Sequence, residues 1–65
     1  MPSSVVAAFH YYPAKDILRI VYTSGEIYDY KDVPADVYER MRHARSKGVF
    51  LNKEIKGKFT FEKRT

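Results

Sequence analysis

The segment Ile17–Tyr30, ILRIVYTSGEIYDY, constrains the fold more than any other part of the chain. Two runs rich in β-branched and aromatic residues, Ile17–Tyr22 and Glu26–Tyr30, flank the link Thr23–Gly25, a pattern typical of a β-hairpin. If the first two residues of the link form a type I turn and Gly25 is left-handed, the loop has three residues and a bulge. This geometry would determine the register of the two strands.

The register decides which side chains share a face. The three-residue loop pairs Tyr22 with Glu26, Ile20 with Tyr28, and Leu18 with Tyr30. One face then carries the large residues Leu18, Ile20, Tyr22, Tyr28 and Tyr30. A two-residue Ser24–Gly25 loop would instead place the tyrosines beside Arg19 and Val21. We favour the three-residue loop because it gathers the apolar residues together.

Tyr28 and Tyr30 admit two interpretations. On an open sheet they would form a platform for bases, since every base has a π-face that can stack. A chain of 65 residues, however, is near the lower size limit for independent folding, and it has no cysteine to cross-link it. So small a domain cannot leave five large side chains exposed. We therefore expect both tyrosines to belong chiefly to the core.

The other elements follow from local signals. A first strand is expected over Val5–Tyr12, ending before a proline. The segment Asp32–Gly48 predicts a helix with Pro34 in its first turn and glycine at its end. A second short helix is expected over Val49–Gly57, and the tail Lys58–Thr65 is either a short strand or an extended arm. The predicted fold is a single α+β domain over residues 1–65: a three-stranded antiparallel meander covered on one face by one or two C-terminal helices.

Charge is distributed unevenly along the chain. Residues 1–39 hold three basic residues against six acidic ones, whereas residues 40–65 hold nine basic residues against Glu54 and Glu62. The second part therefore has a net charge of +7. A basic half on a small domain favours a polyanionic partner, with nucleic acid the first candidate. The alternative is a solvated surface whose charge serves solubility.

The candidate nucleic-acid-binding residues are the basic and polar side chains of the expected helices: Arg42, Arg45, Lys47, Asn52, Lys53, Lys56 and Lys58. Phosphate contacts from such residues are independent of base sequence and sensitive to salt. Ion pairs at helical spacing, such as Glu39 with Arg42, would consume some of this charge. A different function class stays open, in which a sheet edge binds a partner protein or a second copy of the chain.

Catalytic chemistry is not indicated. His10 and His43 have no cysteine or nucleophile motif beside them, and no phosphate-binding loop, dinucleotide-binding turn or metal-ligand spacing is present. We predict neither an enzyme nor a cofactor or metal site. The N-terminus lacks a signal-peptide pattern, and no segment approaches the ~18 apolar residues that span a bilayer. We expect a cytoplasmic protein with no membrane partner.

Several fragments, taken in order, resemble the KTSC domain family, which is named after a C-terminal extension of some lysyl-tRNA synthetases. They are SSVV, Tyr11, LRIVY before SG, Tyr28 and Tyr30, VP, Tyr38, SKG, and FLN with Ile55. The resemblance covers nearly the whole chain. It implies the α+β fold, and its association with the synthetases implies RNA, tRNA included, as the partner more than DNA.

Overall fold

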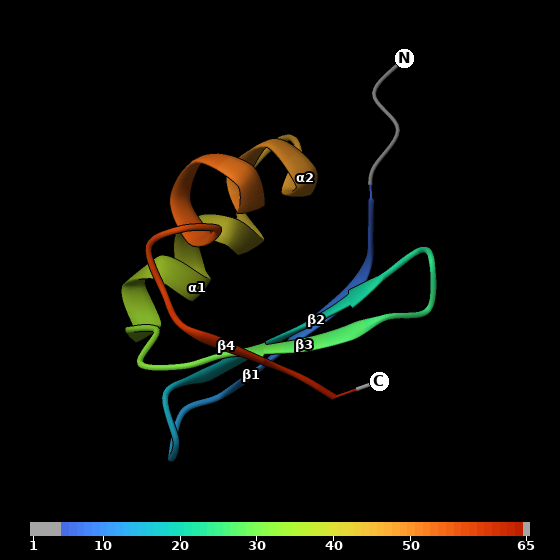
Figure 1. Ribbon diagram of the computed structural model, residues 1–65. Coiled ribbons are helices and arrows are strands. Elements are labelled where there is room, and N and C mark those ends of the chain that lie inside the picture. The colour runs from blue at the N-terminus through green and yellow to red at the C-terminus, as the bar shows by residue number, and fades with distance from the viewer. Residues whose placement is uncertain (1–4, 65) are drawn as a thin grey trace.

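The computed structural model describes residues 5–64, which form an antiparallel sheet with helices packed against one face (Figure 1). The strands are β1 (Val6–Tyr12), β2 (Ile17–Tyr22), β3 (Ile27–Tyr30) and β4 (Phe61–Lys63), and they lie in the sheet in chain order. Between β3 and β4 the chain forms α1 (Ala35–Arg42), α2 (Lys47–Phe50) and the π-helix η1 (Leu51–Ile55), which continues α2. The α+β architecture agrees with the sequence-based prediction.

The predicted number of strands is wrong, because the tail adds a fourth. β4 runs antiparallel to β3 and places Phe61 opposite Tyr30. The backbone N–H of Arg64 donates to the carbonyl of Ile27 at 2.7 Å. Of the two conformations expected for the tail, the strand is therefore the one present. Three residues hold this conformation because the edge of β3 offers them backbone partners.

The hairpin has the predicted register. Leu18 pairs with Tyr30 and Ile20 with Tyr28. The N–H of Tyr22 donates to the carbonyl of Glu26 at 2.8 Å, which closes the three-residue loop. Gly25 has a φ of +96°, the conformation that the bulged turn requires.

The first helix is shorter than predicted. The sequence predicts a helix that continues to Gly48, but α1 ends at Arg42. The ammonium of Lys47 donates to the carbonyls of Arg42 at 3.0 Å and Ala44 at 2.6 Å, which satisfies acceptors that a longer helix would have paired internally.

The second helix correspondingly begins before Val49, where the sequence placed its start. Ser46 is its N-cap, and its hydroxyl accepts a hydrogen bond from the N–H of Val49 at 3.2 Å. Gly48 therefore lies buried inside α2 instead of ending a helix. Gly57, with a φ of +81°, follows the end of η1 as expected.

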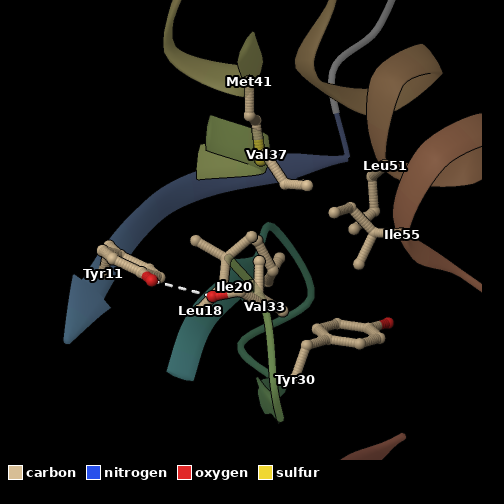
Figure 2. Packing of buried hydrophobic residues seen from close by; sticks show 9 residues of the cluster. All are labelled: Tyr11, Leu18, Ile20, Tyr30, Val33, Val37, Met41, Leu51 and Ile55. Atoms are coloured by element: carbon tan, nitrogen blue, oxygen red, sulfur yellow. Dashed lines mark hydrogen bonds between the residues drawn. The ribbon is translucent and has the colours of Figure 1, made fainter. Parts of the chain in front are cut away.

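The core lies between the sheet and the helices (Figure 2). Val37 and Met41 approach the sheet from α1, and Leu51 and Ile55 approach it from the α2–η1 segment. The buried hydrophobic residues are Tyr11, Leu18, Ile20, Tyr30, Val33, Val37, Met41, Leu51 and Ile55. Tyr30 is thus a core residue, as predicted, whereas Tyr28 is only half-buried.

A buried hydrogen bond ties the segment before α1 to the first strand. The Tyr11 hydroxyl donates to the carbonyl of Val33 at 2.7 Å, drawn as a dashed line in Figure 2. The Val33 N–H in turn donates to the carbonyl of Asp16 at 2.8 Å. The Tyr11 ring stacks on Tyr38 of α1, with centroids 4.9 Å apart. These contacts set the position of α1 over the sheet.

Candidate nucleic-acid interface

A hollow of about 400 Å³ lies where α1 meets α2 and η1. Arg40, Arg45 and Lys53 contribute three cations to its lining. Val49 and Phe50 supply apolar surface between them. The hollow therefore combines positive charge with the aromatic ring of Phe50 and the aliphatic side chain of Val49.

Arg40 is held in place by two contacts. Its guanidinium lies 3.2 Å from a carboxylate oxygen of Glu54 and 5.5 Å from the centroid of the Phe50 ring. By contrast, within residues 5–64 neither Arg45 nor Lys53 forms an ion pair. Glu54 also lines the hollow, but its carboxylate pairs with Arg40 and Lys58, so Arg45 and Lys53 keep cations without an ion-pair partner in the described residues.

The other predicted site residues are more dispersed. Arg42 is exposed and forms an ion pair with Glu39 at 2.9 Å, the spacing that the sequence suggested. Lys47 points back to the end of α1, where it donates the two hydrogen bonds described above. Lys47 is accordingly a helix-capping residue, and a ligand would have to compete with these two carbonyls for its ammonium.

The remaining three predicted residues lie along η1 and just after it. Asn52 is exposed on η1. The Lys58 ammonium lies 3.9 Å from a carboxylate oxygen of Glu54. Lys56 places its ammonium 5.7 Å from the centroid of the Tyr22 ring, where it lines a second concavity. The structure thus brings Arg45 and Lys53 together, and it places Lys56 in a different depression.

The second concavity is an aromatic groove of about 530 Å³ between the end of η1 and the sheet. Its rings come from Tyr22 of β2, Tyr28 and Tyr30 of β3, and Phe61 of β4. The Phe61 ring lies 5.0 Å from that of Tyr28 and 5.6 Å from that of Tyr30, centroid to centroid. Phe61 is exposed and Tyr22 and Tyr28 are half-buried, so these three rings remain accessible, whereas Tyr30 is buried at the base of the groove.

The floor of the aromatic groove carries two hydroxyls. Those of Tyr22 and Tyr30 lie 3.1 Å apart, within hydrogen-bonding distance. Burial is the larger cause, and this hydrogen bond the smaller one, of a pKa of Tyr22 that lies well above its ordinary value. The Tyr22 phenol therefore offers a neutral polar group.

Exposed apolar residues mark both concavities. Among residues 5–64, the large hydrophobic side chains classed as exposed are Val5, Val49 and Phe61. Val49 lines the hollow, and Val5 and Phe61 line the groove. Apolar surface left exposed in a concave, basic setting is typical of a binding region.

Sequence reasoning missed Arg40 and Phe61 as members of these surfaces. Arg40 joins the hollow through Glu54, a partner fourteen positions away that no local spacing indicates. Phe61 reaches the groove because β4 pairs with β3. The alternation of Phe59 and Phe61 was the available signal, but it could not identify the strand that the tail would join.

The opposite face of the sheet carries a polar cluster. Arg19 donates to both carboxylate oxygens of Asp29, at 2.8 and 3.1 Å. These hydrogen bonds lower the pKa of Asp29, whose residue is only 5% exposed. Arg64 lies 3.7 Å from the same carboxylate. The cluster has the compensated charges of a structural ion pair.

No group of three or more His, Cys, Asp or Glu residues in the described part of the chain is arranged to hold a metal ion. No helix within residues 5–64 has the length and apolar character needed to cross a bilayer.

Comparison with known proteins identifies relatives of two kinds. A lysine–tRNA ligase of Nostoc punctiforme is 46% identical over 59 residues, which are 91% of this chain but 10% of the ligase. A lysine–tRNA ligase of another Nostoc strain is 41% identical over the same lengths. The chain thus spans about a tenth of these ligases. A protein of Tsukamurella paurometabola is 39% identical over 57 residues, 88% of this chain and 85% of that protein.

A solved structure agrees with the fold. The crystal structure of a KTSC domain protein from Yersinia pestis superposes with a TM-score of 0.92 at 32% identity, covering 100% of this chain and 92% of that one. The family model described as the KTSC domain matches residues 2–59. The resemblance noted in the sequence is confirmed: the chain belongs to the KTSC domain family.

Proposed function

We propose that this chain is a non-enzymatic binding module, a single cytoplasmic domain that binds RNA through the basic surface of its helices. The observation that carries the proposal is the convergence of Arg45 and Lys53 on one hollow, with no ion-pair partner for either within residues 5–64. Phosphate oxygens are suitable ligands for two such uncompensated cations, because binding them releases condensed counterions. Exposed Val49 and the Phe50 ring give the hollow apolar surface as well.

The other predicted residues add contacts around the hollow in this proposal. Arg42 and Lys58 form exposed ion pairs that contribute little, at most about 1 kcal/mol each, so a phosphate can replace their carboxylate partners. Asn52 is exposed on η1 and offers an amide to phosphate or sugar oxygens. Lys47 contributes less, because its ammonium caps α1.

The comparisons support RNA over other polyanions. The relatives that align with this chain include segments of lysine–tRNA ligases, whose substrate by name is a tRNA. A small module added to such an enzyme would strengthen its hold on RNA without taking part in catalysis. We therefore propose tRNA or another structured or single-stranded RNA as the partner.

The test is a salt-dependent binding titration with matched charge variants. Arg45→Gln/Lys53→Gln removes the two unpaired cations of the hollow, and Lys15→Gln/Lys31→Gln removes the same charge from exposed positions before β2 and after β3. Fluorescence anisotropy with mixed-sequence RNA measures the slope of log affinity against log salt concentration. The first variant should flatten that slope by up to ~1.4, or ~0.7 for each lost contact to a single strand. The second should change it much less.

Two results would contradict the proposal. Equal loss of affinity in both variants would show that only net charge matters. A wild-type protein that binds no RNA near ~0.1 M salt, where surface charges still act over about 10 Å, would rule out an RNA-binding role. If that protein also eluted as a dimer, self-association through a sheet edge would become the better assignment.

A further inference from the structure

We propose that the aromatic groove accepts an unstacked nucleobase of the same RNA strand, and that Lys56 contacts the phosphate next to it. This inference rests on the proposed function and adds a base-binding subsite to the basic hollow. Neither the family match nor the names of the relatives assign a role to the groove.

The first argument is the ring surface that the groove presents. Phe61 is 54% exposed and lies beside the half-buried Tyr28 ring at an interplanar angle of 39°. The rings are tilted, so the pair does not close into a compact stack and ring surface is left open. A planar base in offset contact with Phe61 would cover apolar area that water now meets. The groove volume of about 530 Å³ is more than one base requires.

The second argument is charge. The ammonium of Lys56 lies above the Tyr22 ring, and within residues 5–64 it forms no ion pair. Glu26 also lines the groove, but Lys63 lies 3.1 Å from its carboxylate and lowers its pKa through a hydrogen bond. The acid is therefore compensated, and Lys56 stays available for a phosphate.

The third argument is the hydroxyl pair on the groove floor. Each phenol has one hydrogen, so the bond between Tyr22 and Tyr30 uses one and leaves the other for a ligand. Both oxygens also retain acceptor capacity. Every base edge carries donors or acceptors that such a pair can meet, which suits a subsite with little sequence preference.

The fourth argument is the position of the groove relative to the hollow. Lys53 of η1 lines the hollow and Lys56, the residue after η1, lines the groove, so the two lysines are three positions apart. Exposed Asn52 lies on the same π-helix. A strand whose phosphates contact Lys53 and Lys56 would cross η1, with one base entering the groove. An apolar partner side chain would fill the groove too, but it would gain nothing from the two lysines.

The experiment separates the base from the phosphate. Wild-type protein, Phe61→Leu and Phe61→Tyr are titrated with a short single-stranded RNA and with an abasic oligonucleotide of the same length. Phe61→Leu keeps the apolar volume and removes the ring, and Phe61→Tyr restores the ring. We expect Phe61→Leu to weaken RNA binding about five- to tenfold, the lower part of the range for stacking one base. Binding of the abasic strand and the salt slope should stay unchanged, and Phe61→Tyr should bind RNA like the wild type.

A companion variant tests the phosphate contact. Lys56→Gln should weaken binding of the base-containing and the abasic strands alike, and it should lower the salt slope by up to ~0.7. Circular dichroism of each variant establishes that it is folded before binding is compared.

The outcomes distinguish this inference from the proposed function. If wild type binds RNA and Phe61→Leu binds it equally well, the base subsite is refuted while RNA binding through the hollow stands. Equal affinity of wild type for the base-containing and abasic strands would refute the subsite in the same way. If wild type binds neither strand, the proposed function fails, and the subsite fails with it.

Discussion

Removal of a single oxygen, in Tyr11→Phe, tests the hydrogen bond that joins the first strand to the segment before α1. The hydroxyl donates to the carbonyl of Val33 at 2.7 Å, and Val33 is fully buried. The Tyr11 hydroxyl also lies 3.2 Å from a carboxylate oxygen of the exposed Asp16, but the hydroxyl has one hydrogen, which it donates in the shorter bond to Val33. The ring of Phe would keep the stacking on Tyr38. The change therefore isolates the hydroxyl.

The expected cost follows from what Val33 loses. A net hydrogen bond is worth about 1 kcal/mol, and a buried acceptor left without a partner costs roughly 1–3 kcal/mol. The phenylalanine recovers part of this through its more apolar ring, so we expect Tyr11→Phe to lower the free energy of unfolding by about 2 kcal/mol. For a domain of this size that corresponds to a fall in melting temperature of roughly 10 °C.

Thermal melts followed by circular dichroism, with urea titrations beside them, measure the effect. Tyr12→Phe is the matched control: its hydroxyl is 3.2 Å from the guanidinium of Arg19 on the other face of the sheet, and Arg19 keeps Asp29 as its partner. The control should change stability by less than ~0.5 kcal/mol. Equal stabilities of the two variants would refute the role assigned to the Tyr11 hydroxyl.

Two further predictions concern the turn and the ion pair across the sheet. Gly25→Val should destabilise the fold by about 1–3 kcal/mol in urea unfolding, because a β-branched residue resists the observed φ of +96° although nothing lies within 4 Å of an added Cβ. Gly25→Asn should lower the free energy of unfolding less than Gly25→Val does. If Gly25→Val left the free energy of unfolding unchanged, the bulged turn would be contradicted. Because Arg19 lowers the pKa of Asp29, ionised Asp29 stabilises the fold fully above the ordinary value near 3.9, and this stability is lost as pH falls through the lowered pKa. Asp29→Asn should therefore cost roughly 1–3 kcal/mol at neutral pH and flatten the acid dependence of stability; an unchanged acid profile would disprove this assignment.

Family membership accounts for the fold more directly than for the ligand. The chain aligns with about a tenth of the length of the lysine–tRNA ligases. It also aligns with most of a small protein of Tsukamurella paurometabola. The same module thus occurs both within a large enzyme and as most of a short chain.

The sequence alone predicted the hairpin and its face. The conformational freedom of Gly25 and the alternation around Ile20 and Tyr28 are local properties, and together they admit one register with a coherent apolar face. The sequence also located the excess positive charge after residue 39. Both predictions rest on neighbours within a few positions along the chain.

The helix boundaries depended on side-chain contacts that hydrophobic periodicity does not indicate. The spacing of Val37 and Met41 continues to Ala44, so a single long helix was the natural expectation. In the structure Ala44 lies beyond the end of α1, and the Lys47 ammonium takes carbonyls that the longer helix would have used. Competition between a side-chain donor and the helical backbone thus decided where the helix ends.

The tertiary structure alone decided how the candidate surfaces are composed. Phe61 entered the groove because β3 had an edge for the tail to join, and Arg40 joined the hollow because Glu54 was brought beside it. Lys53 and Lys56, three positions apart, line different concavities because Lys53 lies within η1 and Lys56 follows its end with an extended backbone. Local propensity and periodicity act over a turn or a strand pair, whereas these contacts form only after distant segments have closed onto one core.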